Sequence, residues 1–209
     1  MMQAPERSAE RDAALDAVLA QVPQLGWTMA ALRAGLEASG GDPLDAELLF
    51  PGGVPDMIEA FIDLIDRRMA EAAARTDLTV LRIPARVRAV ILLRLEQHSE
   101  HREAIRRAAA VLANPCHARL AARCAARTAD AIWYAAGDRT SDFSWYTKRA
   151  TVAAVYGATL LFWLRDMDGD DTATRAFLDR RLAGVARVHK FRKRVQAALE
   201  RMLPGEAAA

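Results

Sequence analysis

The chain has 209 residues, with 29 basic and 27 acidic side chains and a net charge of +2 at neutral pH. This balance excludes a protein that binds nucleic acid or membranes through its overall charge, so any such affinity has to come from local clusters. Hydrophobic residues make up 52% of the chain, much of it alanine, and aromatic residues only 6%. Such a composition, without alternating strand patterns, predicts an all-α fold.

The cysteines and the N-terminal residues indicate the cellular compartment of the protein. Cys116 and Cys124 are too few for a disulfide framework and are typical of a reducing compartment. Glu6, Glu10 and Asp12 lie where a secretory signal has its apolar core and where a mitochondrial presequence avoids acids. We therefore expect a cytoplasmic protein of a bacterium.

Three short helices and a longer fourth are predicted in the N-terminal part. The first spans residues 7–22, and Thr28 is the expected N-cap of the second. The third spans residues 44–49. The fourth begins near Val54, with Pro55 in its first turn, where a missing N–H costs nothing.

This layout is that of a helix-turn-helix domain, placed at residues 7–53, but its charge argues against DNA. The helix that would read bases contains Asp42, Asp45 and Glu47 and no Lys or Arg. Phosphate contacts and base reading both favour basic or amide side chains, so we expect no nucleic-acid partner. A ligand-responsive transcriptional regulator with this layout is the alternative function.

A larger helical domain is predicted over residues 54–203. Its further helices are expected at residues 78–98, 102–112, 118–136, 143–166, 172–185 and 188–202, separated by turn residues. The uncharged run at residues 150–164 is shorter than the roughly 20 residues that cross a bilayer and indicates a buried helix. Its first half is rich in Ala and Gly, so it either packs closely on another helix or leaves room for a ligand.

Residues 137–149 combine an acidic, hydroxyl-rich turn with Trp145, Tyr146 and two cations. Arg149 lies one turn beyond Trp145 on the same helix face, where an arginine can stack on the ring. If exposed, this group has the composition of an interface hot spot. The alternative is a pair of core aromatics covered by Arg149.

The chain resembles the lipid-binding accessory protein family of ubiquinone (coenzyme Q) biosynthesis. The resemblance covers residues 13–182 and is most specific at residues 136–138, 141–143, 145–150 and 153–156, supported by residues 25–28 and 49–53. It implies a tetracycline-repressor-like, all-helical homodimer that does not bind DNA. It also implies a pocket for an isoprenoid quinone or phospholipid, which the protein makes available to demethoxyubiquinone hydroxylase, a membrane-bound di-iron enzyme.

The resemblance implies two sites, and only the first of them is carried over residue by residue. The hydroxylase would contact Asp142, Trp145, Tyr146 and Arg149. A lipid pocket is expected to be apolar with few polar groups, and a filled core is the alternative at the same positions. The expected lining residues are Val87, Val90, Ile91, Leu95, Ile132, Trp133, Ala154, Gly157, Ala158 and Leu161.

The last predicted helix is amphipathic and basic. Its apolar stripe includes Val188, Phe191 and Val195, and Lys190, Lys193 and Arg194 lie on the other side. Such a helix suits an anionic membrane surface, so we expect a protein peripheral to the bacterial inner membrane. Packing on its own domain or on a dimer mate is the alternative.

Catalytic and metal-binding patterns are not found in the sequence. His98 and His101 share a helix face, but the Glu-x-x-His pairs of di-iron bundles are missing around them. We interpret this segment as a solvated helix end. Nucleophile elbows, phosphate loops and dinucleotide fingerprints are also absent. We therefore expect a protein that is not an enzyme and that binds no metal and no cofactor.

Overall fold

The computed structural model describes residues 4–138, 145–166 and 170–202; the side chains of residues 145 and 188–202 lie outside the description. The elements in these ranges are all helical, which confirms the all-α prediction. They are α1 (Ala9–Leu19), α2 (Val22–Leu25), α3 (Met29–Ala38), α4 (Asp45–Leu49), α5 (Gly53–Arg75), α6 (Ile83–Glu96), η1 (Ser99–His101), α7 (Arg102–Leu112), η2 (Pro115–His117), α8 (Ala118–Ala135), α9 (Trp145–Trp163) and α10 (Thr172–Met202).

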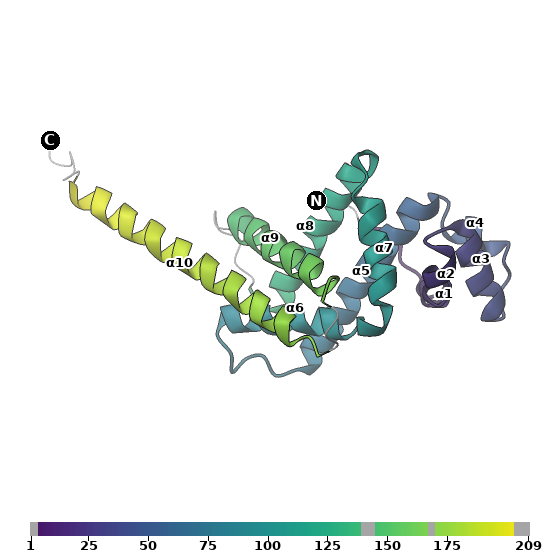
Figure 1. Ribbon diagram of the computed structural model, residues 1–209, viewed down its shortest axis with the longest axis horizontal. Coiled ribbons are helices and arrows are strands. Elements are labelled where there is room, and N and C mark those ends of the chain that lie inside the picture. The colour runs from purple at the N-terminus through teal and green to yellow at the C-terminus, as the bar shows by residue number, and fades with distance from the viewer. Residues whose placement is uncertain (1–3, 139–144, 167–169, 203–209) are drawn as a thin grey trace.

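Helices α1 to α4 gather at one end of the molecule, and α10 extends from the body at the other end (Figure 1). Ser8 and Thr28 cap α1 and α3 by accepting a backbone N–H. Helices α1 and α3 cross closely at Gly35, where a Cβ atom would lie 2.7 Å from the Ala17 carbonyl oxygen. A side chain larger than hydrogen at residue 35 would therefore push the two helices apart.

Helix α5 links the two ends of the molecule, because it packs against both α1 and α8. Side chains reinforce the link to α1: Arg7 binds Asp63, and Arg67 binds both Asp12 and Asp63. A division of the chain at residues 53 and 54, as the sequence predicts, therefore falls at the start of a helix that both parts share.

Three predicted helix limits are wrong. The first predicted helix, residues 7–22, ends at Leu19, and Val22 begins the separate helix α2. Helix α6 begins at Ile83 and not at residue 78, because Pro84 belongs to a first helical turn and the preceding residues form turns. The two helices expected at residues 172–185 and 188–202 are one helix, α10. The single glycine in it, Gly184, lowers helix propensity without breaking the backbone hydrogen-bond pattern.

The core of the larger part lies between α5, α6, α8 and α9. Phe61, Ile65, Ile91, Ile132 and Trp163 are among its fully buried side chains. Among the helices of the described ranges, none is both long and apolar enough to cross a membrane.

Candidate functional site

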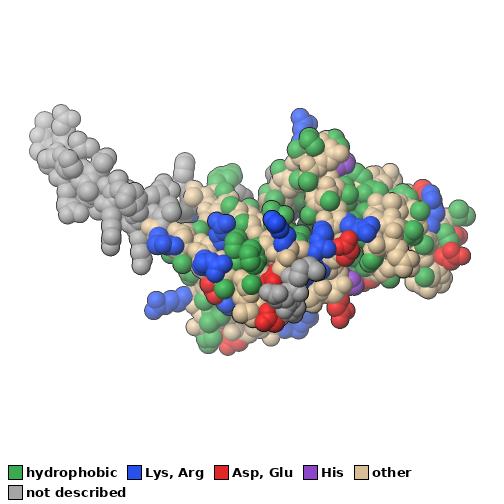
Figure 2. Space-filling view, in the orientation of Figure 1, with side chains coloured by type: hydrophobic (Ala, Val, Ile, Leu, Met, Phe, Trp, Pro, Cys, Tyr) green, Lys and Arg blue, Asp and Glu red, His purple; other side chains and the backbone are tan. Residues whose placement is uncertain are grey.

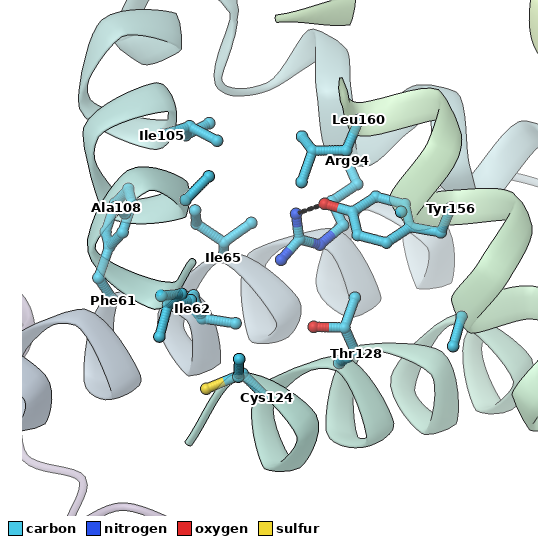
Figure 3. Close-up of a pocket in the computed structure, with 16 residues that line it drawn as sticks. Phe61, Ile62, Ile65, Arg94, Ile105, Ala108, Cys124, Thr128, Tyr156 and Leu160 are labelled. Carbon is cyan, nitrogen blue, oxygen red and sulfur yellow. Dashed lines mark hydrogen bonds between the residues drawn. The ribbon is translucent and has the colours of Figure 1, made fainter. Parts of the chain in front are cut away.

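A cavity of about 170 Å³ lies between α5, α7, α8 and α9, with Arg94 of α6 also in its wall. Small side chains on three of these helices leave the space open: Ala108 on α7, Ala121 on α8, and Ala153 and Gly157 on α9. Larger apolar side chains complete the wall, as Phe61, Ile65, Ile105 and Leu160 show in Figure 3. An apolar cavity of this kind suits a hydrophobic ligand.

One end of the cavity is polar. Arg94 donates from Nε to Asp66 at 2.8 Å and from Nη1 to the hydroxyl of Tyr156, and Thr128 donates to the other oxygen of Asp66 at 2.8 Å. All four side chains are buried. Figure 3 shows Arg94, Tyr156 and Thr128 together at this end. Burial raises the pKa of the Asp66 carboxyl, and the charge of Arg94 and the hydrogen bond from Thr128 oppose that rise.

The thiol of Cys124 also lies in the cavity wall. Burial raises its pKa to about 11. Cys124 is therefore a neutral wall group at neutral pH and a poor nucleophile, because the thiolate is the reactive form.

The polar end of the cavity was not predicted from the sequence. Asp66 and Arg94 each lie within the apolar stripe of their helix, next to Ile65 and Leu95. Charged residues in such positions are rarely buried unless they are paired. An acidic and a basic residue, each on the apolar face of its helix, could therefore have indicated a buried ion pair.

The predicted lipid-binding residues lie in four different environments: the cavity, the partly exposed surface, a groove and the core. Gly157 lines the cavity. Trp133 is half-buried, and Leu161 is 60% exposed. Two further residues, Ala154 and Ala158, line a groove between α9 and α10. The remaining ones, Val87, Val90, Ile91, Leu95 and Ile132, are buried in the core.

The rotation of α9 explains this difference. Its face with Ala153, Gly157 and Leu160 lines the cavity, whereas Ala154 and Ala158 point about 100° away, as consecutive helical residues do. Periodicity identifies such faces but not which of them meets the cavity. Apart from Gly157, the residues expected to bind lipid are thus not brought together around this space, and their role stays a prediction.

The predicted hydroxylase-contact residues lie at the start of α9. Asp142 and the side chain of Trp145 lie outside the described part of the chain. Tyr146 is 77% exposed. Arg149 forms an ion pair with Asp130 of α8 and is mostly covered. The exposed Tyr146 fits a surface contact, and the predicted stack of Arg149 on Trp145 falls outside the described residues.

The predicted membrane-contact residues, Val188, Lys190, Phe191, Lys193, Arg194 and Val195, belong to α10, and their side chains lie outside the description. The described part of α10 is itself basic. Arg180, Arg181 and Arg187 line the groove of about 560 Å³ between α9 and α10. Figure 2 shows basic side chains gathered over this region, next to hydrophobic ones.

The helix end that contains His98 differs from the prediction of a solvated segment. His98 is only 3% exposed, and its Nδ1 lies 3.2 Å from the carbonyl oxygen of Arg94. Burial lowers its pKa to about 4, so the ring is neutral at neutral pH. Groups of three or more His, Cys, Asp or Glu side chains able to hold a metal are not found among the described residues.

The arrangement of these helices defines the class of protein. It matches the TetR transcriptional regulator from Nitrosomonas europaea with a TM-score of 0.68, covering 86% of this chain and 99% of that chain. At 22% sequence identity, this similarity shows the fold alone. The protein therefore has a tetracycline-repressor-like fold, as predicted.

Sequence relatives narrow the class to a family. Residues 118–189 match the COQ9 family model. The ubiquinone biosynthesis protein coq9 of Schizosaccharomyces pombe is 32% identical over 189 residues, which are 90% of this chain and 74% of that protein. The chain belongs to the COQ9 family.

More distant relatives have the same name. The ubiquinone biosynthesis protein COQ9 of Drosophila melanogaster is 32% identical over 80% of this chain and 52% of its own length. For the human protein the identity is 27%, over 91% of this chain and 62% of its own length. The chain thus spans about half to three quarters of the lengths of these relatives.

The names of these relatives correct the predicted location. All three are named as mitochondrial proteins, which contradicts a cytoplasmic protein peripheral to the inner membrane of a bacterium. The prediction rested on Glu6, Glu10 and Asp12. Glu10 and Asp12 lie in the first turn of α1, where acids favour the helix dipole. They serve the folded domain and carry no information about targeting.

Proposed function

We propose that the protein is a non-catalytic lipid-binding protein of ubiquinone biosynthesis that binds an isoprenoid quinone intermediate. The observation that carries the proposal is an apolar cavity with one polar end, in a chain whose relatives are named as ubiquinone biosynthesis proteins. An isoprenoid quinone combines a ring bearing oxygens with an apolar tail. Its two parts thus match the two kinds of wall in the cavity.

The driving force for binding is the burial of apolar surface, at about 25 cal/mol per Å² removed from contact with solvent. A cavity of about 170 Å³ is close in size to an engineered cavity of about 150 Å³ that binds benzene. It holds one ring or a short apolar segment. The rest of a long tail would leave through the side where Leu112, Ala125 and Leu160 are at least partly exposed.

The ligand would be supplied to demethoxyubiquinone hydroxylase. The surface proposed for this contact is the start of α9, with Asp142, Trp145, Tyr146 and Arg149. The basic, amphipathic α10 would hold the protein at an anionic membrane surface, where both the quinone and the hydroxylase are found. We also propose that the protein forms a homodimer. A phospholipid is the alternative ligand for the cavity.

Two matched glycine variants test the cavity. A Cβ atom added to Gly157 or to Gly184 meets no atom within 4 Å, so both positions accept a side chain. Gly157→Leu places its side chain at the cavity, whereas Gly184→Leu faces the groove between α9 and α10. Calorimetric titration with a short-tailed ubiquinone analogue should show binding by the natural chain and by Gly184→Leu, and at least tenfold weaker binding by Gly157→Leu. Equal binding by all three would contradict the proposal.

The fold match to a transcriptional regulator supports one alternative, DNA binding. Helix α4 is only five residues long and carries Asp45 and Glu47 in its first turn. Glu47 is paired with Arg33, and Leu44 and Leu48 are more than three-quarters exposed. A gel-shift experiment at low salt should therefore show no retarded band, and a band that salt abolishes would favour the regulator.

A further inference from the structure

The polar end of the cavity carries a hydrogen-bond donor that the protein leaves unused. Arg94 is 4% exposed and donates from Nε to Asp66 and from Nη1 to Tyr156. Its third nitrogen, Nη2, donates to none of the residues that the structure describes. Figure 3 shows the guanidinium pointing into the cavity. Because Arg94 lines the cavity and its other two nitrogens are bonded, Nη2 can donate to an acceptor inside the cavity that the chain does not supply.

Tyr156 offers a second donor at the same place. Its oxygen accepts a hydrogen bond from Arg94, so its own proton remains to be donated. Within the described ranges that proton has no acceptor. Thr128 differs, because its hydroxyl donates to Asp66. The cavity therefore presents two donors, one from Arg94 and one from Tyr156, to anything that enters it.

The net charge of the polar end of the cavity indicates which class of lipid head group it can bind. Arg94 and Asp66 form a buried ion pair at 2.8 Å, so the pair carries no net charge. A phosphate group would bring a negative charge next to a carboxylate that already neutralises the arginine, and it would lose its hydration as well. A neutral carbonyl or phenol oxygen needs only donors. The polar end therefore fits the ring of a quinone better than the head of a phospholipid.

We propose that the ring of the isoprenoid quinone enters the cavity first and that one ring oxygen accepts hydrogen bonds from Arg94 Nη2 and from the Tyr156 hydroxyl. The tail then leads out past Leu112 and Leu160. This inference rests on the proposed function and adds to it the orientation of the ligand and the residues that select it. It also implies that the ring has to leave the cavity before the hydroxylase reaches it.

The test compares two ligands with the same alkyl tail: a ubiquinone analogue and an alkylbenzene, which has a ring but no oxygen. Their dissociation constants are measured for the full chain and for Tyr156→Phe and Arg94→Lys, with melting curves as a check on folding. Tyr156→Phe removes only the hydroxyl, and Arg94→Lys keeps the charge that Asp66 needs. Tyr134→Phe, at a residue that is 66% exposed on α8, is the matched control.

We expect the quinone to bind about 3- to 10-fold more weakly to Tyr156→Phe and about tenfold more weakly to Arg94→Lys, as the loss of one hydrogen bond predicts. Alkylbenzene binding should change by less than about twofold in both, and Tyr134→Phe should alter neither ligand. The infrared carbonyl band of the bound quinone should lie at lower frequency in the natural chain than in Tyr156→Phe.

Three results would overturn the inference in distinguishable ways. If the natural chain binds quinone and alkylbenzene equally and neither variant changes this, the cavity binds lipid without selecting the ring. If a short-chain phosphatidylcholine binds more tightly than the quinone and depends on Arg94, the site recognises phosphate. If none of the ligands binds, the proposed function fails together with the inference. If Tyr156→Phe melts at a much lower temperature than the natural chain, its binding data are not interpretable, and the binding of quinone by Arg94→Lys tests the inference instead.

Discussion

Two arginines in different parts of the molecule are equally buried but differ in their surroundings. Arg11 and Arg94 are each 4% exposed. Arg11 donates to the Leu49 carbonyl and to Asp56, both at 2.6 Å, and the Phe50 ring covers its guanidinium at 4.4 Å. Protein atoms therefore enclose Arg11, which joins α1 and α4 to α5, although its Nε is buried without an acceptor among the described residues. An arginine thus contributes to packing between α1, α4 and α5, whereas the arginine on α6 faces a cavity.

Arg94 faces the cavity with one donor unused, although Asp66 and Tyr156 bind its other nitrogens. The comparison teaches that burial alone does not mark a functional side chain. What separates the two arginines is whether protein atoms or a cavity lie beyond the guanidinium.

The largest effect is expected from breaking the ion pair at the cavity. Asp66→Ala leaves the Arg94 charge buried without its partner and should lower the free energy of unfolding by about 3–5 kcal/mol. The control, Asp16→Ala, breaks the exposed pair with Arg68 and should lower it by less than about 1 kcal/mol. Urea denaturation of both variants gives the comparison. Equal losses would mean that the buried pair has no special role.

The second effect concerns the buried histidine next to Arg94. The pKa of His98 is about 4 in the folded protein, below its ordinary value of 6.5, so the unfolded chain takes up the proton first as the pH falls. The stability that His98 contributes is therefore complete above pH 6.5 and is lost between pH 6.5 and pH 4. By pH 4.5 the loss should reach about 2–3 kcal/mol.

His98→Gln removes the titrating ring and keeps a polar group near the Arg94 carbonyl. Unfolding free energies at pH 7 and pH 4.5 should therefore differ less for this variant than for the natural chain, by about 2–3 kcal/mol. The same pH dependence in both proteins would show that other groups, such as carboxylates, dominate acid unfolding.

The smallest effect is expected for Gly157→Leu. This substitution gives α9 a better helix former at a site with open space, so thermal unfolding should show a gain of up to about 1 kcal/mol while ligand binding falls. Such opposite changes in stability and binding indicate that the cavity was kept open for a ligand. A loss of stability would mean that the side chain meets atoms and that the space is part of the packing.

The fold was predictable from the sequence to a large extent. Helical periodicity and capping residues predicted the all-α fold, and the limits of α7 match the prediction. The start of α6 and the continuity of α10 were not predicted, because residues such as Pro84 and Gly184 do not by themselves decide where a helix begins or breaks.

The candidate site was predictable only in part. The sequence left open whether the small residues of α9 pack on another helix or leave room for a ligand, and Gly157 lines the cavity. It did not indicate which face of α9 meets that space, nor that Asp66 and Arg94 meet each other across two helices. Contacts between residues 28 positions apart depend on how helices are rotated and packed, and periodicity within one helix does not encode that.

Native mass spectrometry of the purified full chain tests the central claim most directly, because it shows whether a lipid fills the cavity. The account predicts one isoprenoid quinone or quinone precursor per chain, present in the natural protein and in Gly184→Leu and lost from Gly157→Leu. A bare protein mass in all three, or a phospholipid that Gly157→Leu retains, would contradict it.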